Sequence, residues 1–376
     1  MKTPAPFEDA PRPPRDRYRL PLLALALTAV LFLTTGPRVP FTAYAPRVGL
    51  AQRYCRLDEL SKGWWESSPV DSQTWPRLKD SRGYRFGLEG NRTATTCYSR
   101  DPATLDALAA ANSWRWKPKV CALRPFDPAR LVRRLGERAQ RRGNGAGILF
   151  VGDESARTQS ISLESLLGRH IARGYLADGV PFSSVQLEGP AGGLAFSKRD
   201  YLVSSRDWQL MLPEDADGGQ SVANETEDIW TRRTNGKDII VVNTGGRWGS
   251  ITPARLARYI DMAKQVIEYV DQLQTSTLIV RSLVPPLSNC STFGVTRVGN
   301  TTSGDEASEV ARDFEAMNNV WKDLLHDHPR HQFLEMPSTW PVAHLSAKVC
   351  EAMQRCLPGP VDTWNALLAH AIMGLS

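Results

Sequence analysis

The sequence predicts an α/β fold, with a parallel β-sheet covered by helices on both faces. Three short apolar runs are typical of buried strands, at 148–151, 238–242 and 277–280. Segments with helical apolar spacing follow them, at 157–167, 252–273 and 306–326. Strands that alternate with helices in this way form parallel sheets, because each helix carries the chain back to the start of the next strand.

Helix-capping residues and shorter apolar patterns place the other elements. A helix begins after Asp127, which suits the N-cap, with Pro128 at its first position. Thr252 caps the next long helix in the same way, and Pro253 opens it. The remaining elements are one or two strands within 194–212, a loop at 215–228, a strand at 333–336 and a last helix at 361–373.

The composition is that of an ordinary globular protein, with 41% hydrophobic and 23% charged residues in a chain of 376. This length accommodates one large domain, or a small domain joined to a medium one. The net charge is +6, yet the basic residues are scattered and do not alternate with aromatic residues. We therefore expect no nucleic-acid partner.

The N-terminal region predicts a membrane anchor. Residues 1–19 are rich in proline and arginine and form a tail, residues 20–36 are apolar, and residues 37–54 form a stem. The apolar stretch is at the short end of what spans a bilayer, and the arginines before it keep the tail in the cytosol. A cleaved signal peptide is the alternative, and the signal anchor is favoured because the polar leader is long.

In either case the rest of the chain is expected in a secretory compartment, and the Golgi membrane is the predicted location, with the C-terminal domain lumenal. Six cysteines, all beyond the apolar stretch, suit a compartment in which disulfides form. Four glycosylation triplets agree with that location, and begin at Asn91, Asn224, Asn289 and Asn300.

Residues 55–126 are predicted to form a loop-rich module that is joined by disulfides to an α/β domain at 127–376. The module has no long periodic pattern and is rich in tryptophan, with Trp64, Trp65, Trp75, Trp114 and Trp116. Tryptophan side chains either fill a core or stack on sugar rings, and a core role is favoured for each of them.

Three motifs resemble the PC-esterase or trichome-birefringence-like family of polysaccharide O-acetyltransferases. The segment FVGDESARTQ is similar to the family's F-V-G-D-S-L-x-R-N-Q, WRWKPKVC to its W-R-W-K-P-x-x-C, and CLPGPVDTWN to the end of its C-terminal motif. The resemblance begins near Cys55 and implies a flavodoxin-like SGNH fold with three layers. In the first motif Gly152, Asp153 and Arg157 match, but Glu154 occupies the position of the nucleophilic serine.

The other site positions implied by the resemblance are partly kept. DIIVVNTG is similar to the family's D-V-L-V-F-N-T-G, so Asn243 is the expected oxyanion donor. Gln354 occupies the position of the catalytic histidine and Glu351 that of its aspartate. Glutamine cannot take up a proton at neutral pH, so both nucleophile and base are replaced. The Glu154 carboxylate is expected to face Asn243.

The first interpretation is therefore a catalytically degenerate member that binds a cell-wall or capsular polysaccharide or a partner acetyltransferase. The alternative is an active O-acetyltransferase or acetylesterase in which Ser155 is the nucleophile and His344 the base. A third hypothesis is glycoside hydrolysis by a carboxylate pair drawn from Asp153, Glu154 and Glu351, but nothing in the sequence indicates such a substrate. We expect no cofactor, and the acetyl donor stays undefined.

Two further expectations concern cysteine and histidine side chains. The resemblance implies three disulfides, Cys55–Cys121, Cys97–Cys356 and Cys290–Cys350; the cysteines alone allow 15 pairings. His326, His328 and His331 lie close together in sequence, but no cysteine or acidic ligand set accompanies them, so no metal site is predicted.

Overall fold

The structure is a computed structural model. It describes residues 53–69, 106, 109–110, 112–143, 146–176, 180–199, 201–202, 230–234, 236–246, 248, 250–284, 304–337 and 359–375. These residues belong to one compact unit, Gln52–Ser376. The predicted tail, the anchor and all but the last two residues of the stem lie outside the described residues. Within the described part, no helix has the length and apolar character needed to cross a bilayer.

A seven-stranded sheet organises the unit. Its strands follow the order β4 (Ile171–Gly174), β5 (Phe182–Leu187), β6 (Gly193–Lys198), β3 (Gly147–Gly152), β7 (Ile239–Asn243), β8 (Thr277–Arg281) and β9 (Gln332–Leu334). From β6 to β9 every neighbouring pair is parallel, with β3 between β6 and β7. The α/β class and the central parallel strands agree with the sequence-based prediction.

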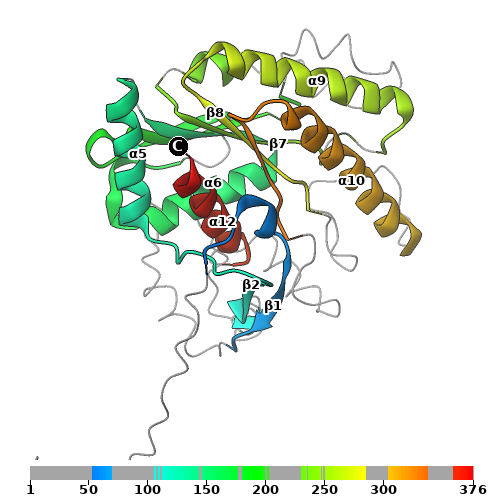
Figure 1. The fold of residues 1–376 in the computed structure, drawn as a ribbon, viewed down its shortest axis with the longest axis horizontal. Helices are drawn as coiled ribbons and strands as arrows, with labels where there is room; N and C mark the ends of the chain where they lie inside the picture. Colours follow the sequence, from blue (N-terminus) through cyan, green and yellow to red (C-terminus); the bar gives the residue numbers. More distant parts are fainter. Residues whose placement is uncertain are drawn as a thin grey trace, which may run out of the picture. The chain divides into compact units, whose positions relative to one another are not determined.

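Helices cover both faces of the sheet (Figure 1). On one face lie α5 (Pro128–Arg142), α6 (Glu154–Leu167) and α12 (Val361–Gly374), and on the other α9 (Pro253–Gln272) and α10 (Gly304–His326). Alternate residues of β3 serve the two layers: Ile148 and Phe150 pack toward α6 and α12, whereas Leu149 and Val151 pack toward α9 and α10. A strand buried on both faces has to be apolar throughout, and β3 is.

The predicted helix caps are confirmed. The Asp127 carboxylate accepts a hydrogen bond from the backbone N–H of Arg130 at 3.1 Å, and Pro128 is the first residue of α5. Thr252 Oγ1 likewise accepts from the backbone N–H of Arg255 at 3.3 Å, at the start of α9. These side chains satisfy backbone donors that the first helical turn leaves without partners.

Two features differ from the sequence-based expectation. The sheet is not wholly parallel, because β5 pairs with β6, and β4 with β5, in antiparallel fashion. The strand β5 went unpredicted although buried and exposed residues alternate along it. The segment expected to be irregular contains a two-stranded antiparallel sheet, in which β1 (Gly63–Ser67) pairs with β2 (Trp114–Pro118).

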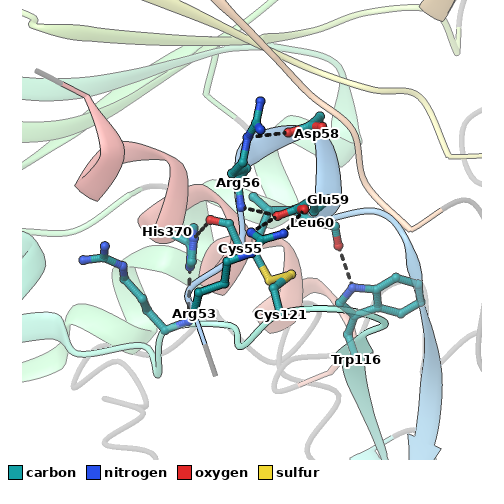
Figure 2. Close-up of a disulfide and its surroundings, with 10 residues drawn as sticks. Arg53, Cys55, Arg56, Asp58, Glu59, Leu60, Trp116, Cys121 and His370 are labelled. Carbon is teal, nitrogen blue, oxygen red and sulfur yellow. Dashed lines mark hydrogen bonds and ion pairs between the residues drawn. A yellow bond between two sulfur atoms is a disulfide. The ribbon is translucent and has the colours of Figure 1, made fainter. Parts of the chain in front are cut away.

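The N-terminal segment is fastened to the C-terminal helix around a disulfide between Cys55 and Cys121 (Figure 2). His370 of α12 donates from Nε2 to the Cys55 carbonyl at 2.8 Å and accepts at Nδ1 from the backbone N–H of Arg124 at 3.1 Å. The Trp116 indole donates to the Leu60 carbonyl at 2.7 Å. Trp116 is thus a core residue, as expected, whereas Trp64 is 46% exposed, so the core role expected for Trp64 is wrong.

Candidate active site

The carboxyl ends of three neighbouring strands bring polar side chains together. Gly152, the last residue of β3, lies opposite Asn243, the last residue of β7. Arg281 ends β8, one residue after the pairing of that strand with β7. Asn243 and Arg281 continue the alternation of the residues that face α6 and α12, so both side chains lie on that side of the sheet.

Gly152 permits this close arrangement. A Cβ atom at this position would lie 2.1 Å from the backbone oxygen of Asn243 and 2.9 Å from the Cβ of Ala156. Any other residue would push β3 away from β7 or from the start of α6. The glycine therefore brings the first turn of α6 directly against the end of β7.

Asp153 determines how α6 begins. Its Oδ1 accepts hydrogen bonds from the backbone N–H of Ser155 at 2.9 Å and from Ser155 Oγ at 2.8 Å. Asp153 is the N-cap, and Glu154 is the first helical residue. An acidic group at this end of a helix is also favoured by the helix dipole.

The expectation that the Glu154 carboxylate faces Asn243 is wrong. Glu154 points away from the sheet edge, and its side chain is 47% exposed and pairs with Arg157 three residues later on the helix surface. Ser155 occupies the inner position instead, with Oγ 2.6 Å from Asn243 Oδ1. The physical reason is the cap: once Asp153 starts the helix, the first residue turns outward and the second turns toward the strands.

Ser155 Oγ has three hydrogen-bond partners. It lies against Asp153 Oδ1 and Asn243 Oδ1, and it accepts a hydrogen bond from Nη2 of Arg281. A hydroxyl carries one proton, so it donates to one of the two oxygens at a time. The Asn243 amide nitrogen donates to the Arg281 backbone carbonyl at 3.2 Å, which links β7 to β8 at this edge.

Arg281 is almost fully buried, with 2% of its surface exposed. Its guanidinium carbon lies 4.6 Å from the centre of the Trp364 ring, a cation–π contact with α12. Its Nε is buried and has no hydrogen-bond partner in the part of the chain that the structure describes. Burial lowers the pKa of Arg281 to about 10, while the nearby Asp153 carboxylate acts in the opposite direction. Arg281 is therefore a positive charge at neutral pH.

Polar contacts hold α12 against α6 and so keep Trp364 in place. Asp362 accepts a hydrogen bond from Ser162 Oγ at 2.7 Å. The Asn365 amide donates to the same Ser162 Oγ at 2.8 Å and to the backbone carbonyl of Gln159 at 3.0 Å. The DTWN residues of the C-terminal motif thus connect α12 to the helix that carries Ser155.

The remaining predicted site residues lie outside the described residues: Glu351, Gln354 and His344, the cysteines Cys97, Cys290, Cys350 and Cys356, and the four glycosylation asparagines. Of the implied disulfides, the structure contains Cys55–Cys121, and the other two pairs fall on residues it does not describe. Arg157, a matching motif residue, is half-buried and pairs with Glu154.

His328 and His331 contact Asp271 and strand β8, and not Ser155. His331 accepts the backbone N–H of Leu278 at its Nδ1, 3.2 Å away, and its other nitrogen faces Asp271. Burial lowers the pKa of His331, despite that carboxylate. His328 also pairs with Asp271. In the described ranges, no group of three or more histidine, cysteine or acidic side chains is arranged to hold a metal ion.

Sequence reasoning missed Arg281 and Trp364. Both had a detectable pattern: Arg281 is a charged residue directly after a buried apolar strand, in the same place on its strand as Asn243. Trp364 lies inside the motif that was used only to align the C-terminal segment. Parallel strands end at the same edge of a sheet, so a polar residue ending each of two strands predicts a shared site.

Comparison with known proteins finds partial relatives. The chain is 28% identical over 173 residues to a probable xylan O-acetyltransferase 11 from Oryza sativa subsp. japonica, covering 43% of this chain and 39% of that protein. It is 26% identical over 149 residues to a trichome birefringence-like protein 7 from Arabidopsis thaliana, covering 36% and 30%. The chain thus spans well under half of these relatives. This similarity supports a relationship to trichome-birefringence-like proteins, and no family model matches the chain.

Solved structures add little. Toc33 from Arabidopsis thaliana aligns over 65% of this chain and 91% of its own with a TM-score of 0.28 and 9% identity. A SAR1-type GTP-binding protein from Encephalitozoon cuniculi aligns over 65% and 86% with a TM-score of 0.27 and 10% identity. Scores this low do not indicate a shared fold.

Proposed function

We propose that this chain handles O-acetyl esters of a polysaccharide at the carboxyl edge of β3, β7 and β8, with Ser155 as the side chain that meets the acetyl group. The observation that carries the proposal is the position of Ser155 Oγ, in contact with Asp153, Asn243 and Arg281. A serine hydroxyl that contacts an acceptor and a fixed positive charge has two of the features that acyl transfer uses, a proton acceptor and a group that stabilises negative charge.

The polysaccharide is supported by the relatives. One is named as a probable xylan O-acetyltransferase, and the other as a trichome birefringence-like protein. We propose by analogy that the substrate of this chain is a cell-wall or capsular polysaccharide. The secretory location and the single membrane anchor expected from residues 20–36 belong to the same proposal.

A second candidate is binding without turnover, to a polysaccharide or to a partner acetyltransferase. It is favoured by the partners of Ser155: among the described side chains, none that contacts Oγ is an imidazole. Serine enzymes depend on such a base, and losing it costs on the order of 10⁶ in turnover. In this candidate Glu154 and Gln354 mark the lost nucleophile and base, and His344 has no catalytic role.

The test compares variants of the full-length chain with acetylated xylan and with 4-nitrophenyl acetate as substrates. If the proposal is right, wild type releases or transfers acetyl groups, and Ser155→Ala removes that activity. Glu154→Gln is the matched control, because it changes a surface side chain on the same helical turn, and it is expected to keep full activity.

Other results separate the candidates. If wild type binds xylan without turnover, and the double variant Glu154→Ser, Gln354→His gains turnover, the second candidate is correct. If wild type turns over substrate equally well after Ser155→Ala, the assignment of Ser155 is wrong. Absence of both xylan binding and turnover in wild type would overturn both candidates.

A further inference from the structure

We propose that Arg281 is a catalytic residue of this site, whose guanidinium positions Ser155 and stabilises negative charge on Ser155 Oγ as the hydroxyl attacks. The inference rests on the proposed function, because it concerns the same hydroxyl. It goes further in naming a group that the sequence motifs did not identify and in assigning its chemical task.

The first argument is the contact itself. The Arg281 Nη2 donates to Ser155 Oγ, so the hydroxyl cannot direct its proton toward the guanidinium. The proton has to point toward Asp153 Oδ1 or Asn243 Oδ1, 2.8 and 2.6 Å away. Arg281 thereby aims the proton of Ser155 at groups that can accept it.

The second argument is the placement of the charge. A positive group that is buried beside an oxygen acts in a medium of low dielectric, where its effect on a developing anion is far larger than in water. Arg281 is almost fully buried, and its guanidinium lies against the Trp364 ring. That ring holds the guanidinium without neutralising it. The Asp153 carboxylate is near enough to act on the pKa of Arg281, and the two side chains are linked through Ser155 Oγ.

The third argument is the unused donor. The Arg281 Nε is buried, and no atom of the described residues accepts a hydrogen bond from it. Leaving such a donor without a partner is unfavourable by roughly 1–3 kcal/mol. The Nε–H and the outer Nη2 of a guanidinium point the same way, so an oxygen that arrives beside Ser155 Oγ would satisfy it. The oxygen that forms on an attacked ester carbonyl is such a group.

The step balances as follows. The proton of Ser155 Oγ passes to Asp153 Oδ1, and Oγ forms a bond to the carbonyl carbon of an acetyl ester. The bond from that carbon to the alcohol oxygen of the donor then breaks, and the leaving oxygen takes the proton from Asp153. The products are acetylated Ser155 and a free alcohol, and Arg281 stays protonated throughout.

The experiment follows the reactivity of Ser155 with a fluorophosphonate, which phosphonylates activated serine hydroxyls and releases fluoride. The rate is measured against pH, and the modified residue is located by mass spectrometry. Wild type is compared with Arg281→Lys and Arg281→Met, and circular dichroism checks that each variant is folded. Lys264→Met, which removes one exposed positive charge on α9, is the matched control.

We expect modification of Ser155 in wild type and in the control at equal rates. In Arg281→Met the rate falls by about 10²-fold, the loss typical of one group that stabilises an oxyanion. Its pH profile also moves to higher pH, because the hydroxyl has lost a nearby positive charge. Arg281→Lys keeps the positive charge but lacks the planar guanidinium with its parallel N–H donors. We expect it to retain part of the rate and a pH profile close to that of wild type.

Two results would overturn the inference: no reaction at Ser155 in wild type, or an unchanged rate and pH profile in Arg281→Met. Xylan turnover in the same samples separates this outcome from failure of the proposed function. If turnover requires Ser155 but the reaction at Ser155 ignores Arg281, only the inference fails. If Arg281 controls Ser155 but no acetyl xylan is bound or cleaved, the polysaccharide function fails and the inference stands.

Discussion

Two arginines are buried to the same extent at opposite ends of the sheet, and their surroundings differ. Arg138 of α5 and Arg281 of β8 are each 2% exposed. Arg138 bonds to the Asp238 carboxylate through Nε and Nη2, next to the start of β7, and Arg142 reaches the same carboxylate. Arg281 bonds through one nitrogen to the Ser155 hydroxyl and lies against the Trp364 ring, and its Nε finds no acceptor among the described residues.

The different partners of the two arginines indicate a structural role for Arg138 and a functional role for Arg281. A buried charge that is paired with a carboxylate fixes how elements pack, because either partner alone would be strongly unfavourable. A buried charge that faces a hydroxyl keeps its electrostatic influence and remains available to a reacting group. Arg138 therefore ties α5 to the amino end of the sheet, whereas Arg281 serves the site at the carboxyl end.

The largest expected contrast is in stability. Arg138→Met leaves the buried Asp238 carboxylate with Arg142 as its one remaining ion-pair partner among the described residues, and we expect a loss of about 3–5 kcal/mol in the free energy of unfolding. Arg281→Met removes the hydrogen bond to Ser155 and the cation–π contact with Trp364, but it also removes the buried Nε donor that no described residue satisfies, so the loss should stay below about 1.5 kcal/mol. Urea unfolding measures both, with the exposed Arg141→Met on α5 as the control. Equal losses for the two buried arginines would contradict the comparison.

A second variant tests whether Arg138 has only a structural role. Replacing both partners, Arg138→Met with Asp238→Leu, exchanges an ion pair for apolar contacts. Such exchanges in other proteins are often neutral. We expect the double variant to unfold within about 1 kcal/mol of wild type, with Arg142 turning to solvent. Its activity in the acetyl-ester assay proposed above should match that of wild type, and a loss of activity in the folded double variant would show that Arg138 is more than a packing residue.

The sequence predicted the strands that carry this site better than it predicted which side chains contact one another there. Strands β3, β7 and β8 are buried at every position and each contains an apolar run, which can be recognised without a structure. Which side chain of the DES turn faces inward was not readable, because it depends on the residue at which α6 starts. Helix boundaries vary by a residue or two in sequence-based reasoning, and one residue exchanges Glu154 for Ser155.

The pairing of distant segments was equally hard to foresee. Strand β5 pairs with β6 in antiparallel fashion, and the five residues that join them, 188–192, are too few for a parallel crossover. The direction could therefore have been foreseen if β5 itself had been recognised. Arg281 gains its role from Ser155, which is 126 positions earlier in the chain. The family resemblance named the positions of the site, but the charge that acts on it comes from a strand whose motif was not compared.

A smaller effect concerns the ring beneath Arg281. Trp364→Phe keeps an aromatic face under the guanidinium and Trp364→Leu does not, so Leu should lose more stability. In a double-mutant cycle with Arg281→Met, we expect a coupling energy of about 1 kcal/mol between Trp364 and Arg281. The same cycle with Arg138→Met is the control and should give no coupling. If both cycles give the same value, Trp364 acts only as bulk in the core.

The smallest expected effect extends the comparison to a buried imidazole. Burial lowers the pKa of His370, the nearby Arg124 charge acts in the same direction, and the hydrogen bond to the Cys55 carbonyl opposes both. His370 is then neutral when folded, whereas in the unfolded chain it binds a proton near its ordinary pKa of about 6.5. The stability it contributes is present above that value and is lost as pH falls toward and through the lower folded pKa.

The measurement is the free energy of unfolding at pH 7.5 and at pH 5.5. Wild type should be less stable at the lower pH, because protonated Nδ1 can no longer accept the backbone N–H of Arg124. His370→Gln does not titrate, and it should reduce the difference by on the order of 1 kcal/mol, the size of one hydrogen bond. His331→Gln is the parallel variant, since burial also lowers the pKa of His331. If His370→Gln leaves the pH dependence unchanged, the effect belongs to His331 or to the carboxylates. The contact between His370 and Cys55 would then contribute to packing and not to the pH dependence.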